Sequence, residues 1–130
     1  MYLPALKSAQ VAKRFRLGAH TAVVVTDCES DGMISYMHVL YVIPDGAAIP
    51  VFAVAAELSQ LLLDQKGSQT GGDEGAFLGV FPGNGHRNLG MSPDWLDLEK
   101  FTTEALKIAA QHLQVTDAPV PLRRYTEFYN

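Results

Sequence analysis

The chain has 130 residues, of which 48% are hydrophobic and 18% are charged, and its formal net charge is −4 at pH 7. This composition excludes an intrinsically disordered chain, and the length fits one domain with its own core. The negative charge argues against general nucleic-acid binding. Cys28 is the single cysteine, so an internal disulfide is excluded, and no stretch approaches the ~18 apolar residues of a membrane span. We therefore expect a cytoplasmic protein that has no contact with a membrane.

Residues 2–17 are predicted to form a first helix that ends at Gly18. Apolar residues recur at helical spacing from Leu3 onward, and Pro4 suits a first helical turn. The same segment contains four basic residues and no acid: Lys7, Lys13, Arg14 and Arg16. A solvated helix with a basic last turn is the favoured interpretation, and a basic patch that contacts nucleic acid is the alternative.

Three β-strands are predicted next, at residues 19–28, 33–43 and 50–57. These segments are rich in β-branched and aromatic residues, and Asp-Gly and Pro-Asp-Gly turn signals separate them. The connections are too short for parallel crossovers, which indicates an antiparallel meander.

The second of these strands is apolar on both faces, whereas a solvated antiparallel sheet alternates apolar and polar residues. Two helices could cover one face. A second copy of the chain is the simplest cover for the other, which predicts a homodimer, and a ligand cavity is the alternative.

The later part of the chain is predicted to hold a fourth strand at residues 76–81 and a long helix at residues 92–115. Ser92 and Pro93 are typical of a helix start. Residues 58–66 fit either a strand or a short helix, the helix being favoured, and the tail after Pro121 could add an edge strand. We therefore predict a single α+β domain, with a mostly antiparallel sheet of four to five strands packed by an N-terminal helix and a long C-terminal helix.

The sequence FPGNGHRNLG, residues 81–90, resembles a phosphate-binding loop because it combines glycines, a cation and a following helix start. It matches neither the P-loop pattern nor the dinucleotide fingerprint, so a turn is the favoured interpretation. Asn84, His86 and Arg87 are its candidate ligand-binding residues. In the enzymatic alternative, Arg87 holds a carboxylate or phosphate and His86 transfers protons.

Three further candidates lie on the predicted strands: Tyr36, His38 and Glu57. A lone carboxylate at Glu57, near tyrosines or a histidine, could act as a general base or ligand anchor. His38 lies among apolar residues, which favours a hydrogen-bonded core or interface histidine. Acids flank Cys28 and would raise the pKa of its thiol, so it is not expected to be a nucleophile. No metal or cofactor is predicted.

These observations favour a non-enzymatic binding or interaction protein that acts as a homo-oligomer through an apolar sheet face. The first alternative is a small enzyme that acts on an anionic substrate at residues 83–90. The second alternative is nucleic-acid binding through the basic N-terminal helix.

Overall fold

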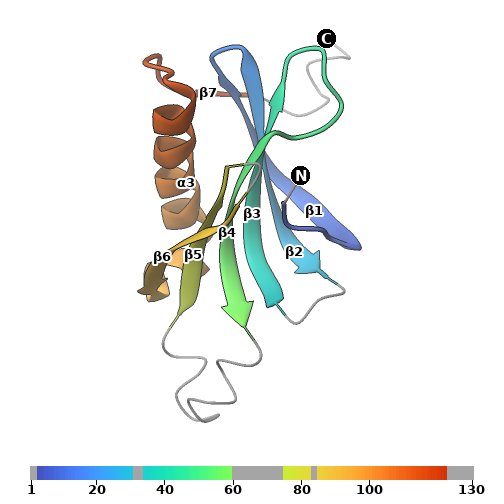
Figure 1. The fold of residues 1–130 in the computed structure, drawn as a ribbon, viewed down its shortest axis with the longest axis vertical. Helices are drawn as coiled ribbons and strands as arrows, with labels where there is room; N and C mark the ends of the chain where they lie inside the picture. Colours follow the sequence, from blue (N-terminus) through green and yellow to red (C-terminus); the bar gives the residue numbers. More distant parts are fainter. Residues whose placement is uncertain (1–2, 31–33, 60–74, 83–84, 123–130) are drawn as a thin grey trace.

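The computed structural model describes residues 3–30, 34–59, 75–82 and 85–122. Within these ranges the chain forms one sheet of seven antiparallel strands, in the order β6-β5-β4-β3-β2-β1-β7, and a single α-helix (Figure 1). The elements in chain order are β1 (Ser8–Leu17), β2 (His20–Glu29), β3 (Ile34–Pro44), β4 (Phe52–Ser59), β5 (Ala76–Phe81), β6 (Arg87–Ser92), the 3₁₀ helix η1 (Pro93–Leu96), α3 (Leu98–Leu113) and β7 (Val120–Pro121).

The predicted N-terminal helix is wrong, because residues 8–17 form strand β1. The helical spacing rested partly on alanines, which discriminate poorly between a helix and a strand. From Arg14 to Leu17, charged and apolar residues alternate with period two, and Phe15 and Leu17 pack into the core. A tight turn at Gly18, with φ +61°, then pairs Leu17 with His20 and aligns β1 with β2.

The predicted sheet of four to five strands is also wrong, since the sheet has seven. The meander of β2, β3 and β4 is present, as is β5 at the predicted residues. Strand β6 was missed because its sequence, RNLGMS, carries no alternation and no β-branched residue, and it forms only by pairing with β5. Leu58 and Ser59 belong to β4, whereas residues 60–66 lie outside the described ranges.

The predicted C-terminal helix is divided into two elements. Ser92 accepts a hydrogen bond from the Asp94 backbone N–H at 3.1 Å and so caps the 3₁₀ helix η1. Asp97 then caps α3 by accepting from the Lys100 backbone N–H at 2.9 Å. No helix in the described ranges is both long enough and apolar enough to cross a membrane.

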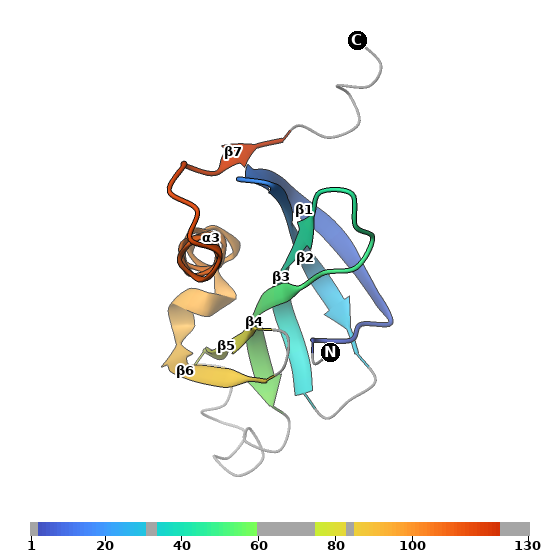
Figure 2. The ribbon, with the colours of Figure 1, turned by 45° about the horizontal axis from the view of Figure 1, so that its top comes forward.

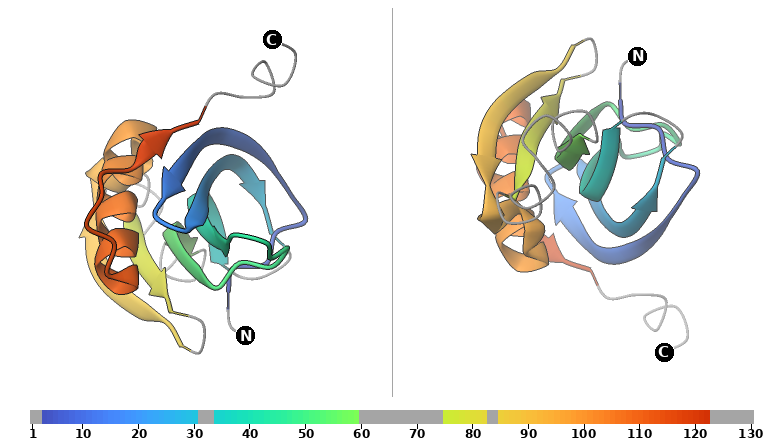
Figure 3. Two further views of the ribbon diagram at one scale, coloured as in Figure 1. Left: turned by 90° about the horizontal axis from the view of Figure 1, so that it is seen from above. Right: turned by 90° about the horizontal axis from the view of Figure 1, so that it is seen from below.

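Helix α3 packs against β3 and β4 on one face of the sheet, which we call the helix face (Figure 2). The sheet is strongly twisted, and in the end-on views α3 lies along one side of it (Figure 3). The strands and the helix bury a continuous core there: Leu17, Ala22, Val24, Leu40, Val42, Phe52, Val54, Ala56, Ala76, Leu78, Val80, Phe101, Ala105, Leu106 and Ala109.

The opposite face of the sheet holds a second apolar cluster and is called the N-terminal face. Its buried residues are Val25, Val39, Ala53, Ala55 and Phe81. Leu3 and Leu6 pack on this cluster, and the Tyr41 hydroxyl donates to the Pro4 carbonyl oxygen at 2.6 Å. Both faces of β3 are therefore covered within one chain, so this strand alone does not require a second copy to bury it.

Candidate functional site

Glu57 and His86 meet on the N-terminal face of the sheet. Glu57 is near the end of β4, and His86 directly precedes β6. The two side chains reach each other across β5, with His86 Nε2 3.1 Å from Glu57 Oε1. Glu57 is only 3% exposed, whereas the His86 side chain is 28% exposed. The pair therefore connects a buried carboxylate to the surface of the molecule.

Gly79, in the middle of β5, provides the space for this contact. A Cβ atom at this position would lie 2.5 Å from Glu57 Oε1 and 2.9 Å from His86 Nε2. Both distances are far shorter than a normal van der Waals contact. A side chain at residue 79 would have to displace the pair, so the strand carries a residue that has none.

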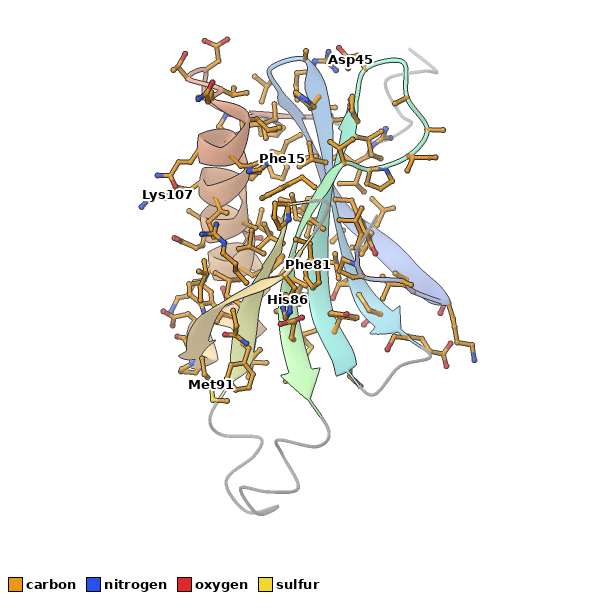
Figure 4. All side chains as sticks on the ribbon, in the orientation of Figure 1. Phe15, Asp45, Phe81, His86, Met91 and Lys107 are labelled. Carbon is orange, nitrogen blue, oxygen red and sulfur yellow. The ribbon has the colours of Figure 1, made fainter. Side chains whose placement is uncertain are left out.

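Two aromatic side chains lie beside the pair. The His86 imidazole stacks on the Phe81 ring, with centroids 4.5 Å apart and planes 17° apart (Figure 4). Tyr36 lies directly opposite Glu57 in the antiparallel register of β3 and β4. Cross-strand neighbours of this kind point to the same face of a sheet, so Tyr36 flanks the carboxylate.

Burial is the main influence on the Glu57 carboxyl, and it raises the pKa of this group above the usual value of 4.5. The nearby His86 acts in the opposite direction, through its charge and its hydrogen bond, and lowers the pKa by a smaller amount. The second carboxyl oxygen, Oε2, is buried and has no hydrogen-bond partner among the described residues. A buried polar atom without a partner is costly, so this oxygen is suited to accept a donor from a bound molecule or to carry a proton.

The structure places His38 on the other side of the sheet, away from the Glu57–His86 pair. His38 is 5% exposed, and both of its ring nitrogens have partners. Nε2 lies 3.0 Å from the Leu96 carbonyl oxygen, and Nδ1 lies 3.0 Å from Thr26 Oγ1. A carbonyl can only accept, so Nε2 donates to the Leu96 carbonyl oxygen. This histidine holds η1 onto the sheet.

Arg87 does not join His86. It pairs with Val80 in the sheet register, and Val80 faces α3, so Arg87 is directed to the helix face. Asn84, the remaining candidate of the loop, lies outside the described residues. The structure thus brings Glu57, His86 and Tyr36 together and separates them from His38 and Arg87.

Lys13 and Arg16, which belong to the basic set near the N-terminus, form ion pairs with acids elsewhere in the described part of the chain. Lys13 contacts Glu99 on α3, and Arg16 contacts Asp45 in the turn after β3. Glu99 and Asp45 therefore neutralise part of the positive charge on which the nucleic-acid alternative depends. The basic helix predicted for this alternative is also absent from residues 8–17, which form β1.

Cys28 lies at the edge of the N-terminal face. Burial raises the pKa of its thiol to about 11, and the charge of Asp27 adds to this effect. Such a thiol is protonated at neutral pH and is a poor nucleophile. Within the described ranges, no three histidine, cysteine or acidic side chains are grouped so as to hold a metal ion.

The contact between Glu57 and His86 was missed from the sequence, although both residues were candidates. One signal was present: Gly79 interrupts the apolar strand at residues 76–81, and a glycine inside a strand often marks a close approach of other atoms. The partner strand could not be identified, because β6 itself was not predicted.

The chain matches no protein-family model, no curated protein and no solved structure.

Proposed function

We propose that this protein is a binding protein whose site is the Glu57–His86 pair on the N-terminal face. Its ligand is a planar group that carries an N–H donor, such as an amidine, a guanidinium or an amino-substituted heterocycle. The observation that carries this proposal is the buried Oε2 atom of Glu57, which lacks a hydrogen-bond partner among the described residues while Oε1 is held by His86.

The surroundings of the carboxylate favour a planar donor over an anion. A carboxylate accepts hydrogen bonds from N–H groups, and charge assistance makes such bonds strong. The partly exposed His86 ring, held in place by its stacking on the buried Phe81, offers a flat surface to a ring or a guanidinium plane, and Tyr36 lies nearby. Arg87 is directed to the opposite face, so it does not provide a positive charge at this position.

This proposal does not require a second copy of the chain, because the N-terminal segment packs on the apolar cluster beside the site. The homodimer and the cytoplasmic location stay predictions from the sequence. Nucleic-acid binding is not proposed, since its basic helix is replaced by β1 and two of its cations are paired.

Thermal unfolding with benzamidine and benzoate tests the proposal. Benzamidine is expected to raise the melting temperature, because it combines a ring with a cationic N–H donor, and benzoate is not. Glu57→Gln should abolish the benzamidine shift, whereas Glu104→Gln on α3 should retain it. The proposal fails if benzoate stabilises the protein instead, or if the Glu57→Gln variant responds to benzamidine as the wild type does.

A second candidate function is acid–base catalysis by the same pair. Two observations favour catalysis: the raised pKa of Glu57, and the hydrogen bond between Glu57 and the partly exposed imidazole of His86. In such an arrangement the carboxylate orients the histidine, which acts as the base. Hydrolysis of p-nitrophenyl acetate is a simple probe for it. A rate above that of free imidazole that is lost in both Glu57→Gln and His86→Asn would favour the enzyme over the binding protein.

A further inference from the structure

A cavity of about 420 Å³ lies between strand β1 and helix α3, on the face of the sheet opposite the Glu57–His86 pair. Most of its wall is apolar: Val11 and Phe15 line it from β1, Leu106 from α3, and Pro121 and Leu122 from the region of β7. Figure 4 shows Phe15 in the space between the helix and the strands. The volume falls within the usual range for small-molecule sites.

Thr102 provides a polar group in this apolar wall. It lines the cavity from α3, it is 4% exposed, and its Oγ1 atom has no hydrogen-bond partner in the described part of the chain. A threonine hydroxyl inside a helix usually donates to a carbonyl one turn earlier. The neighbouring Thr103 does so, with its Oγ1 3.0 Å from the Glu99 carbonyl oxygen. Thr102 therefore retains a hydrogen-bonding capacity that no described residue uses.

The charged groups at the cavity favour an uncharged ligand. Lys13 and Arg14 from β1 and Glu99 from α3 line it. Lys13 and Glu99 form an ion pair across the space between the two elements. Arg14 pairs with Val23, which packs on the N-terminal face of the sheet, so its side chain is directed away from α3. A carboxylate on the ligand would be attracted by Lys13 and repelled by Glu99. A protonated amine would be attracted by Glu99 and repelled by Lys13. Neither sign of charge gains an advantage from this pair.

We infer that the cavity between β1 and α3 binds an uncharged, mainly apolar small molecule with one hydroxyl or carbonyl group that bonds to Thr102 Oγ1. The volume of about 420 Å³ is at the small end of the range for small-molecule sites, which suits a compact ligand. A medium-chain alcohol or ketone has this size and this chemistry. The site is separate from the proposed function, since it shares no residue with the Glu57–His86 pair.

Titration of the ¹⁵N-labelled protein with 1-octanol tests this inference. Saturable amide shifts are expected at Phe15, Thr102 and Leu106. Octanoate and octylammonium should bind more weakly than 1-octanol, and tighter binding of either ion would overturn the assignment of an uncharged ligand. The absence of saturable shifts at the cavity would overturn the site itself.

Thr102→Val separates the role of the hydroxyl from that of the apolar wall. The substitution removes a buried hydroxyl without a partner, so the free protein should melt at a higher temperature. The affinity for 1-octanol should nevertheless fall by about threefold to tenfold, which corresponds to one hydrogen bond. An unchanged affinity would refute the role of Thr102.

A matched pair of tryptophan substitutions tests the location. Thr103 is an exposed residue that lines the cavity. Lys107, one turn later on α3, is also exposed but does not line it (Figure 4). Thr103→Trp should weaken 1-octanol binding at least fivefold, whereas Lys107→Trp should leave it unchanged. Equal effects of the two variants would contradict a site between β1 and α3.

Discussion

Glu57 and His86, which are 29 residues apart in the sequence, form a 3.1 Å contact between Oε1 and Nε2 above the backbone of Gly79. The contact crosses a whole strand, since β5 lies between β4 and β6 in the sheet. It leaves one buried carboxyl oxygen of Glu57 without a hydrogen-bond partner among the described residues. The geometry of the pair therefore depends on the glycine beneath it, and its chemistry depends on the burial of the acid.

Gly79→Ala is expected to disrupt this pair. The added methyl group would lie 2.5 Å from Glu57 Oε1, so the side chains or the strand must move. We expect the free energy of unfolding, measured in urea, to fall by about 1–3 kcal/mol, the usual cost of overpacking. Gly85→Ala is the control, because a Cβ there meets no atom within 4 Å. A Gly79→Ala protein as stable as this control would contradict the described packing.

The raised pKa of Glu57 predicts a specific dependence of stability on pH. The folded protein binds the Glu57 proton more tightly than the unfolded chain, whose carboxyl has the usual pKa of 4.5. The contribution of Glu57 to the free energy of unfolding therefore falls as the pH rises from about 4.5 through the raised folded-state pKa. Glu57→Gln removes this titration. The stability of the wild type relative to Glu57→Gln should decrease over that pH window, and an increase there would show that the pKa is lowered instead.

Cys28 is expected to react slowly with thiol reagents in the folded protein. With a pKa of about 11 instead of 9.0, its thiolate fraction at pH 8 is about 100-fold smaller than that of an unperturbed thiol. The rate of alkylation by iodoacetamide should be lower by this factor than the rate in the urea-unfolded chain. It should also continue to rise with pH up to about 11. Equal rates in the folded and unfolded protein would contradict the burial of this thiol.

Gln114→Gly should stabilise the protein. Gln114 ends α3 with φ 58° and ψ 40°, a left-handed conformation that is unfavourable for a residue with a side chain. We expect a gain of about 0.5–1 kcal/mol in the free energy of unfolding. Gln111→Gly, inside the same helix, should instead lose about 1 kcal/mol. A loss of stability at both positions would show that α3 continues beyond Leu113.

The parts of the fold that could be predicted are those with a strong local pattern. Strands β2 and β3 are dense in β-branched and aromatic residues, β4 and β5 are short and mostly apolar, and α3 has a regular apolar stripe. Strand β1 was misassigned because its alternation is confined to the last residues, while the alanines and Pro4 before them fit a helix equally well. Strands β6 and β7 could not be predicted, since one lacks a pattern and the other has only two residues.

The candidate site could be predicted residue by residue but not as a contact. Glu57 is a candidate because it is an acid at the end of an apolar strand. His86 is a candidate because a turn needs the neighbouring glycines but does not need a histidine. Their proximity follows from the pairing of β4, β5 and β6, which is a long-range property of the sheet. Successive side chains of a strand point to opposite faces of the sheet. Because β6 begins at Arg87, this alternation directs Arg87 away from the face on which His86 lies.

The binding of benzamidine, followed by NMR with ¹⁵N and ¹³C labels, tests the central proposal most directly. The proposal predicts saturable shifts at the Gly79 amide, the His86 ring and the Tyr36 ring, with little change at Thr102 or Leu106 on the helix face. It further predicts that His86→Asn weakens these shifts and that Glu57→Gln removes them. Shifts confined to the helix face, or no saturable shift at Gly79 and His86, would contradict the assignment of the Glu57–His86 pair as the binding site.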